Sequence, residues 1–140
     1  MNADSVTDAP PQKAVEIILT RQLASYLAMP VFLVDPQGNL LYYNEPAEAL
    51  LGHRYEESGE LTADVWSTIW EARAEDGRPL APEELPLMMA LTNNSPAHRH
   101  MNITGLDGVP RHIEVTAFPL EGQGGRHLGA VAFFWEAPPR

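Results

Sequence analysis

Residues 34–52 read VDPQGNLLYYNEPAEALLG, and the order of residue types in this stretch decides the fold around it. Pro36 and Gly38 supply turn geometry between two short apolar runs, which predicts a β-hairpin. Asn44 follows the second run and is a good helix N-cap, while Gly52 is placed to end that helix. The stretch therefore predicts a hairpin that leads directly into a short helix between these two caps.

An amphipathic helix is predicted upstream of the hairpin, over residues 12–28. Its apolar side chains recur at helical i, i+3 and i+4 spacing, and Pro30 ends the pattern. Residues 1–11 are small, polar and proline-bearing, which predicts a disordered tail, and residues 137–140 are assigned to a second tail. The apolar stripe of the helix needs an apolar partner.

Downstream of the hairpin, short helices precede three strands. Helical pieces are expected around residues 61–74, where Trp66 and Trp70 share one face and fit a core, and a further helix is expected over residues 82–91. Three strands with glycine-containing turns between them follow, over residues 97–104, 110–120 and 127–135. This order of elements predicts an α+β domain with one antiparallel sheet.

Length, composition and charge limit the possible functions. The chain has 140 residues, 44% hydrophobic and 20% charged, which suits one domain. It has no cysteine, which excludes disulfides, thiol nucleophiles and thiolate metal sites. The formal net charge of −10 repels phosphate backbones and anionic lipids, so nucleic-acid and membrane partners are not expected. Neither a membrane span nor a secretory leader is visible, so we expect a cytoplasmic location.

Three segments of the chain, taken in order, resemble a PAS domain, the sensory module of many signalling proteins. Residues 34–52 resemble its opening, residues 76–87 resemble the approach to its long helix, and residues 113–119 with 129–131 resemble its last two strands. The resemblance assigns residues 29–136 to a PAS-like domain. It implies a five-stranded antiparallel sheet with short helices on one face and a ligand pocket between them. No effector domain is visible, so a stand-alone sensor or a fragment of a larger one is expected.

The departures from the family pattern concern cofactors. Light-sensing flavin-binding members need a reactive cysteine, which this chain lacks. Haem-binding members commonly carry a histidine on the long helix, where this chain has Leu87, Met88, Met89 and Leu91. Flavin photochemistry is therefore excluded and haem is disfavoured, which leaves the cofactor unknown.

The register of the last strands predicts the pocket wall. A three-residue loop with Gly108 in the left-handed position pairs Met101 with Ile113 and Arg99 with Val115. Odd-numbered residues of both strands then face the pocket, and the same parity is expected on the final strand. The predicted ligand contacts are Arg99, Met101, Ile103, Ile113, Val115, Val131 and Phe133 from the sheet, with Met88 and Trp66 from the helices.

Arg99 has two interpretations at this position. A guanidinium on an apolar inner face needs an anionic partner, because arginine is almost never buried unpaired. A ligand carboxylate or phosphate would satisfy it, with Glu83 or Glu84 as counter-ion in the ligand-free state. A permanent structural ion pair, or a bulge that turns the side chain outward, is the alternative.

The other face of the final strand is also expected to be apolar, so it needs cover. The helix over residues 12–28 is the predicted cover, either folded back on its own sheet or packed on a second copy. The family resemblance favours a homodimer. The predicted interface consists of Val15, Ile18, Leu19, Leu23, Tyr26, Leu128 and Phe134.

His100 and His112 lie on the face away from the pocket, with Glu114 beside them. Such a set could hold zinc, but a solvated polar face of a sheet has the same pattern. We favour the solvated face and assign no residue as a metal ligand.

The sequence as a whole predicts a non-catalytic PAS-type sensory domain in signal transduction. It would bind a small, mostly apolar ligand, with an acidic head group if Arg99 binds it, and act through a homodimer or a signalling partner protein. One alternative is a ligand-free interaction module whose own side chains fill the cavity. A small α+β enzyme is a weaker alternative, because the predicted inner face has no Asp or Glu.

Overall fold

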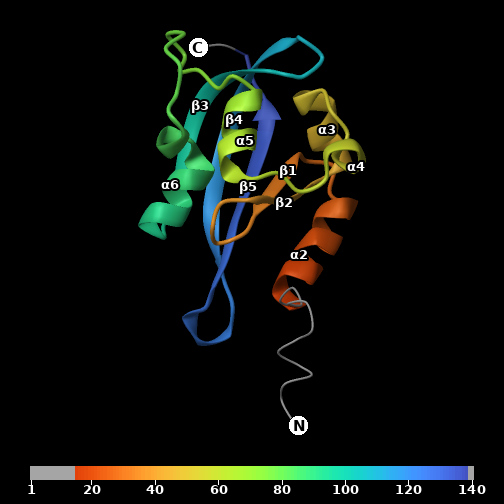
Figure 1. Ribbon diagram of the computed structural model, residues 1–140, viewed down its shortest axis with the longest axis vertical. Helices are drawn as coiled ribbons and strands as arrows, with labels where there is room; N and C mark the ends of the chain where they lie inside the picture. Colours follow the sequence, from red (N-terminus) through yellow and green to blue (C-terminus); the bar gives the residue numbers. More distant parts are fainter. Residues whose placement is uncertain (1–14, 139–140) are drawn as a thin grey trace.

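The computed structural model describes residues 15–138 and consists of one curved sheet with helices on both faces (Figure 1). The predicted tail over residues 1–11 and the first residues of the predicted N-terminal helix lie outside the described range. The elements are α2 (Val15–Tyr26), β1 (Val31–Val34), β2 (Leu40–Tyr43), α3 (Glu45–Leu51), α4 (Tyr55–Ser58), α5 (Ala63–Ile69), η1 (Pro82–Glu84), α6 (Pro86–Asn93), β3 (Ala97–Thr104), β4 (Pro110–Glu121), η2 (Gln123–Gly125) and β5 (His127–Glu136).

The five strands form one antiparallel sheet in the order β2-β1-β5-β4-β3, which confirms the predicted α+β class. The β3–β4 hairpin has the predicted register, because Met101 pairs with Ile113 and Arg99 with Val115. Gly108 in its loop has the expected positive φ of +80°. The helix predicted over residues 82–91 is broken at Leu85 into η1 and α6, and Leu85 has extended φ and ψ because Pro86 follows it.

The predicted parity of β5 is wrong. Val115 pairs with Phe134 and Ala117 pairs with Ala132, so even-numbered residues of β5 share a face with odd-numbered residues of β4. A bulge causes the change: Leu120 pairs with Gly129 but Glu121 pairs with His127, which leaves Leu128 as an extra residue. Odd-numbered Val131 and Phe133 therefore face away from the cavity, contrary to the expectation that they line it.

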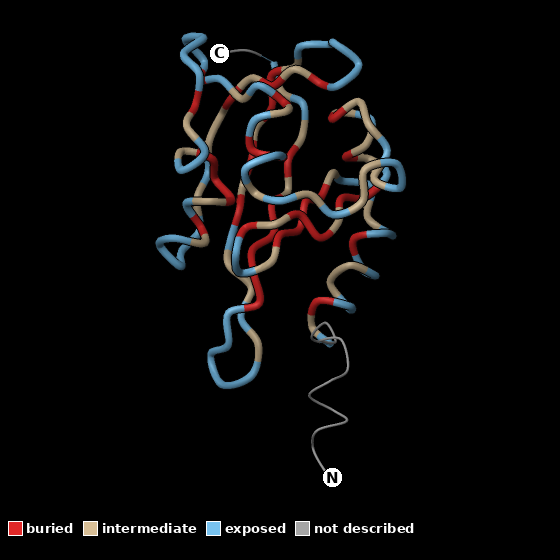
Figure 2. The backbone as a smooth tube through the Cα atoms, viewed as in Figure 1, coloured by how far each residue is buried: buried red, intermediate tan, exposed pale blue. Residues whose placement is uncertain are grey.

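Buried residues are concentrated in the strands at the centre of the sheet (Figure 2), and the sheet separates two apolar cores. The larger core lies between the sheet and the short helices α3, α5 and α6. The smaller core lies under α2, where Ile17 and Ala24 pack with Val31, Leu33 and Val131. The N-terminal helix thus covers the face opposite the short helices, as predicted.

Asn44 joins α2, the sheet and α3. Its Oδ1 accepts hydrogen bonds from the backbone N–H groups of Ala47 (3.2 Å) and Val31 (2.9 Å), so it caps α3 as the sequence predicts. Its Nδ2 donates to the backbone carbonyls of Ala24 and Met29, both at 2.9 Å. Because the side chain is fully buried, these four bonds fix the end of α2 relative to the start of α3.

Candidate functional site

A small apolar cavity of about 80 Å³ lies between the inner face of the sheet and helices α5 and α6. The structure places five of the nine predicted ligand contacts in its wall; these are Met101, Ile103, Ile113, Val115 and Trp66. Phe134, predicted at a dimer interface, lies in the wall as well, because the bulge in β5 turns it inward. Whether these side chains bind a ligand stays a prediction.

Aromatic rings occupy much of the space that surrounds the cavity. The ring centroid of Phe32 lies 5.0 Å from that of Trp66 and 5.9 Å from that of Trp70. Each indole N–H is satisfied by a backbone carbonyl: Trp66 donates to Gly38 at 2.7 Å and Trp70 to Leu51 at 2.9 Å. The aromatic side chains therefore offer a ligand apolar surface and no free donor.

Ser67 is the one polar side chain in the cavity wall among the described residues. It lies on α5 and is 6% exposed. Its hydroxyl oxygen is buried and has no hydrogen-bond partner in the described part of the chain. A buried hydroxyl without a partner costs free energy. A molecule bound in the cavity would therefore form its hydrogen bond with Ser67.

The outward face of α2 is apolar and exposed. Five side chains that the sequence assigned to a dimer interface are 52–81% exposed there: Val15, Ile18, Leu19, Leu23 and Tyr26. The sixth, Leu128, is buried beneath α2 and so cannot reach a partner. The rest of the domain therefore covers only part of the apolar surface of α2.

Comparison with known protein families identifies the domain. A family model described as PAS domain matches residues 28–136. The chain belongs to the PAS domain family. No curated protein sequence matches it.

Solved structures of other proteins share the fold at low sequence identity. The PAS domain of BvgS from Bordetella pertussis is 15% identical, with a TM-score of 0.59 over 89% of this chain and 88% of that chain. The PAS domain of nitrogen regulation protein NR(II) from Vibrio parahaemolyticus is 19% identical, with a TM-score of 0.61 over 85% and 98% of the two chains. The light-state dimer of the fungal blue-light photoreceptor Vivid is 13% identical, with a TM-score of 0.61 over 92% and 98%. At this identity the likeness establishes the fold alone.

Besides Val131 and Phe133, two more predicted ligand contacts lie outside the cavity wall of this PAS domain. Arg99 is only partly buried on the edge strand β3, and its Nε is buried without a hydrogen-bond partner. Met88 packs against the core, and its sulfur lies beside Gly38. Neither side chain is placed to contact a molecule in the cavity.

Glu84, one of the two acidic residues expected to pair with Arg99, has other hydrogen-bond partners. Glu84 binds Arg78 through two hydrogen bonds of 3.1 and 3.2 Å and accepts a third from the backbone N–H of Ala81. The Arg78 guanidinium, helped by this N–H, holds the pKa of the Glu84 carboxyl below its usual range, and the charge of Arg99 adds to the effect. Glu84 thus acts on Arg99 through its charge, while its hydrogen bonds go to Arg78 and Ala81.

The histidine face of the PAS domain differs from the expected solvated surface. His112 is only 7% exposed, because the segment before η1 crosses the edge of the sheet at β3. His98 Nε2 lies 3.0 Å from Glu114 Oε2, and His100 Nε2 lies 3.7 Å from Glu114 Oε1. Glu75 approaches His112 from the crossing segment, and no sequence pattern pointed to it.

None of the described helices is long and apolar enough to cross a membrane.

Proposed function

We propose that the chain is a non-catalytic PAS sensory domain that transmits its signal through a homodimer built on the outward face of α2. The observation that carries the proposal is the exposed apolar face of α2, which has no charged side chain although the protein has a net charge of −10. A large exposed apolar patch is typical of an interaction surface.

The charged residues of α2 turn towards the domain itself. Arg21 lies over the ring of Tyr42, with its guanidinium carbon 4.6 Å from the ring centroid. Glu16 reaches Arg126 of the β4–β5 loop at 3.4 Å. Two copies can therefore bring their α2 helices together without burying a charge, and an uncharged contact suits a chain whose copies repel each other elsewhere.

The spacing on this face favours a second copy of the chain as the partner. Val15, Leu19, Gln22 and Tyr26 recur at intervals of four, three and four residues, which is the spacing of a coiled-coil seam, with Gln22 as its one polar position. Ile18 and Leu23 flank the seam and widen it. A helix with such a seam pairs well with an identical helix.

Ligand sensing in the cavity is the second candidate function, and Ser67 favours it. Ligand pockets typically measure roughly 300–1,000 Å³, so a cavity of about 80 Å³ suits a small apolar molecule with one polar group for Ser67. An acidic head group does not fit this wall, because Arg99 lies outside it. A flavin or a haem would require the helices over the cavity to move.

Asn44 offers a physical link between cavity and dimer. It caps α3, whose Leu51 lines the cavity, and it holds the end of α2 by the carbonyls of Ala24 and Met29. A shift of α3 on ligand binding would therefore move α2. A cytoplasmic location and a signalling partner protein complete the proposal.

Sedimentation velocity of matched variants tests the dimer. Leu19→Glu with Leu23→Glu places four carboxylates in and beside the paired seam, so we expect a monomer with an unchanged circular dichroism spectrum. Leu106→Glu makes the same chemical change at a leucine that is 46% exposed on the β3–β4 loop, and it should remain a dimer. A monomeric wild type, or a double variant that stays dimeric, would refute the proposal.

A further inference from the structure

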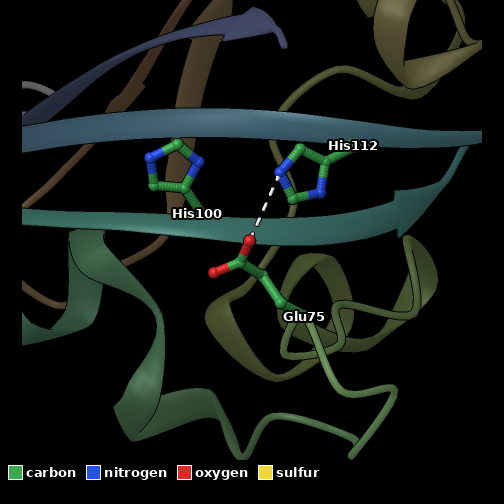
Figure 3. A group of neighbouring side chains, drawn as sticks. All are labelled: Glu75, His100 and His112. Atoms are coloured by element: carbon green, nitrogen blue, oxygen red, sulfur yellow. Dashed lines mark ion pairs between the residues drawn. The ribbon is translucent and has the colours of Figure 1, made fainter. Parts of the chain in front are cut away.

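We propose that Glu75, His100 and His112 form a binding site for a divalent transition-metal ion, with Zn²⁺ as the best fit. The three residues come from the segment between α5 and η1, from β3 and from β4, and they converge on the face of the sheet opposite the cavity (Figure 3). One ligand atom from each lies within 4.8 Å of the others. The site is independent of the proposed dimer.

Hydrogen bonding fixes which nitrogen of His112 carries the proton. Nδ2 of Asn102 donates to the carbonyl of Ala74 at 3.3 Å, so the amide oxygen of Asn102 is turned towards His112. That oxygen lies 2.9 Å from His112 Nδ1, which must therefore be the donor. Nε2 of the neutral imidazole then carries a lone pair.

This lone pair faces a carboxylate. Nε2 of His112 lies 3.8 Å from Oε2 of Glu75 and has no hydrogen-bond partner among the described residues. Two acceptors in this arrangement repel each other unless a cation lies between them. The side chain of His112 is 5% exposed, so water has little access to separate the two groups.

His100 supplies the third ligand. Its ring stacks near that of His112, with centroids 5.7 Å apart and planes inclined by 27°. Figure 3 shows a ring nitrogen of His100 turned towards the His112 ring. Its Nε2 lies on the side of Glu114, 3.7 Å from Oε1, so Nδ1 is the nitrogen of His100 that we assign to the metal site.

Two imidazoles and one carboxylate form a ligand set that suits Zn²⁺, whereas Ca²⁺ and Mg²⁺ prefer oxygen ligands alone. In a tetrahedral zinc site with bonds of about 2.0–2.2 Å, the donor atoms lie about 3.3 Å apart. Glu75 is 41% exposed in its side chain and lies in a turn, so its carboxylate can move closer to the two imidazoles. Three protein ligands leave the fourth position for water or another ligand.

The surroundings of the site match those of a metal-binding histidine. Such a histidine usually donates its second N–H to an oxygen acceptor, which orients the ring. Asn102 provides this acceptor, and two backbone hydrogen bonds of 2.8 Å between Asn102 and Arg73 hold the crossing segment at β3. A bound ion would fasten this segment, whose Ala72 lines the cavity, to the β3–β4 hairpin. The domain would then respond to a metal ion at this site as well as to a ligand in the cavity.

Isothermal titration calorimetry with Zn²⁺ on the full chain, first freed of metal with a chelator, tests the site. We expect one ion per chain, with affinity reduced at least about tenfold by Glu75→Gln and by His100→Gln. Glu83→Gln removes an acid on η1 outside the cluster and should leave the affinity unchanged. Both glutamate positions are exposed in turns or short helices, so these variants should fold normally.

Three results would overturn the proposal. The first is the absence of saturable binding at millimolar Zn²⁺. The second is binding that Glu75→Gln leaves intact or that Glu114→Gln abolishes instead, which would place the ion elsewhere, such as among His98, His100 and Glu114. The third is a nitrogen NMR spectrum in which His112 holds protons on both ring nitrogens with and without Zn²⁺, because a proton would then fill the space between His112 and Glu75.

Discussion

Replacing Asn44 with alanine should weaken the domain strongly, because the side chain makes four hydrogen bonds in the interior. The substitution removes the N-cap of α3, which costs about 1 kcal/mol. It also leaves the N–H of Val31 without a partner in the interior, at about 1–3 kcal/mol, and removes the hydrogen bonds to the carbonyls of Ala24 and Met29, at about 0.5–1.5 kcal/mol each. We expect a loss of about 3–7 kcal/mol in the free energy of unfolding, a large part of the roughly 5–15 kcal/mol of a typical domain.

Urea unfolding followed by tryptophan fluorescence measures this loss, because Trp66 and Trp70 lie in the core. Asn93→Ala is the matched control, since that asparagine is exposed at the end of α6. A loss below about 1 kcal/mol for Asn44→Ala would refute the reasoning, because it would mean that water replaces the four hydrogen bonds without cost.

Asn44→Asp separates the two roles of the side chain. The aspartate keeps an acceptor for Val31 and Ala47 but cannot donate to the carbonyls of Ala24 and Met29. We therefore expect α3 to keep its cap while the end of α2 loosens, and trypsin should cleave after Arg21 faster than in the wild type. An unchanged cleavage rate would show that Asn44 does not hold α2 in place.

Three further predictions concern stability. Gly129→Ala should abolish folding, because a β-carbon there would lie 1.9 Å from the carbonyl oxygen of Val34. The control Gly77→Ala places a β-carbon with nothing within 4 Å, so it should lower the stability measured in thermal melts by only about 1–2 kcal/mol, for its positive φ. Trp66→Ala should cost about 3–5 kcal/mol in urea unfolding and let the enlarged cavity bind a small apolar probe such as xenon, and a loss under 1 kcal/mol would contradict its place in the core. The pKa of Glu84 is lowered in the folded state, first by Arg78. The stabilisation by Glu84 is therefore present above the carboxyl pKa of the unfolded chain and is lost as the pH falls through the folded value. Glu84→Gln should lower the melting temperature at pH 7 but not in strong acid.

Local signals in the sequence predicted the elements on which the fold is built. The turn at Pro36 and Gly38 and the caps at Asn44 and Gly52 gave the hairpin and α3 with their observed bounds, because each depends on residues close in sequence. The β3–β4 register followed from the same kind of evidence, a short loop with Gly108 at a positive φ.

The predictions that failed depend on contacts between distant segments. The parity of β5 was wrong because a bulge at Leu128, absent from any simple alternation of residue types, shifts the register by one residue. The histidine face was predicted to be solvated, but the segment that carries Arg73 and Glu75 crosses β3 and buries His112. An irregular segment has no periodicity that would reveal its path, so Glu75 could not be found from the sequence.

The most direct test of the central claim, that α2 pairs with α2 of a second copy, uses the absence of cysteine from the chain. Single variants Leu19→Cys, Gln22→Cys and Leu23→Cys report on the seam, and Leu106→Cys reports on random collision at an exposed leucine outside it. Under mild oxidation, at least one α2 variant should form a disulfide-linked dimer much faster than Leu106→Cys, and urea should remove the difference. If no α2 variant crosslinks faster than Leu106→Cys, the two helices do not meet and the proposed route for the signal is wrong.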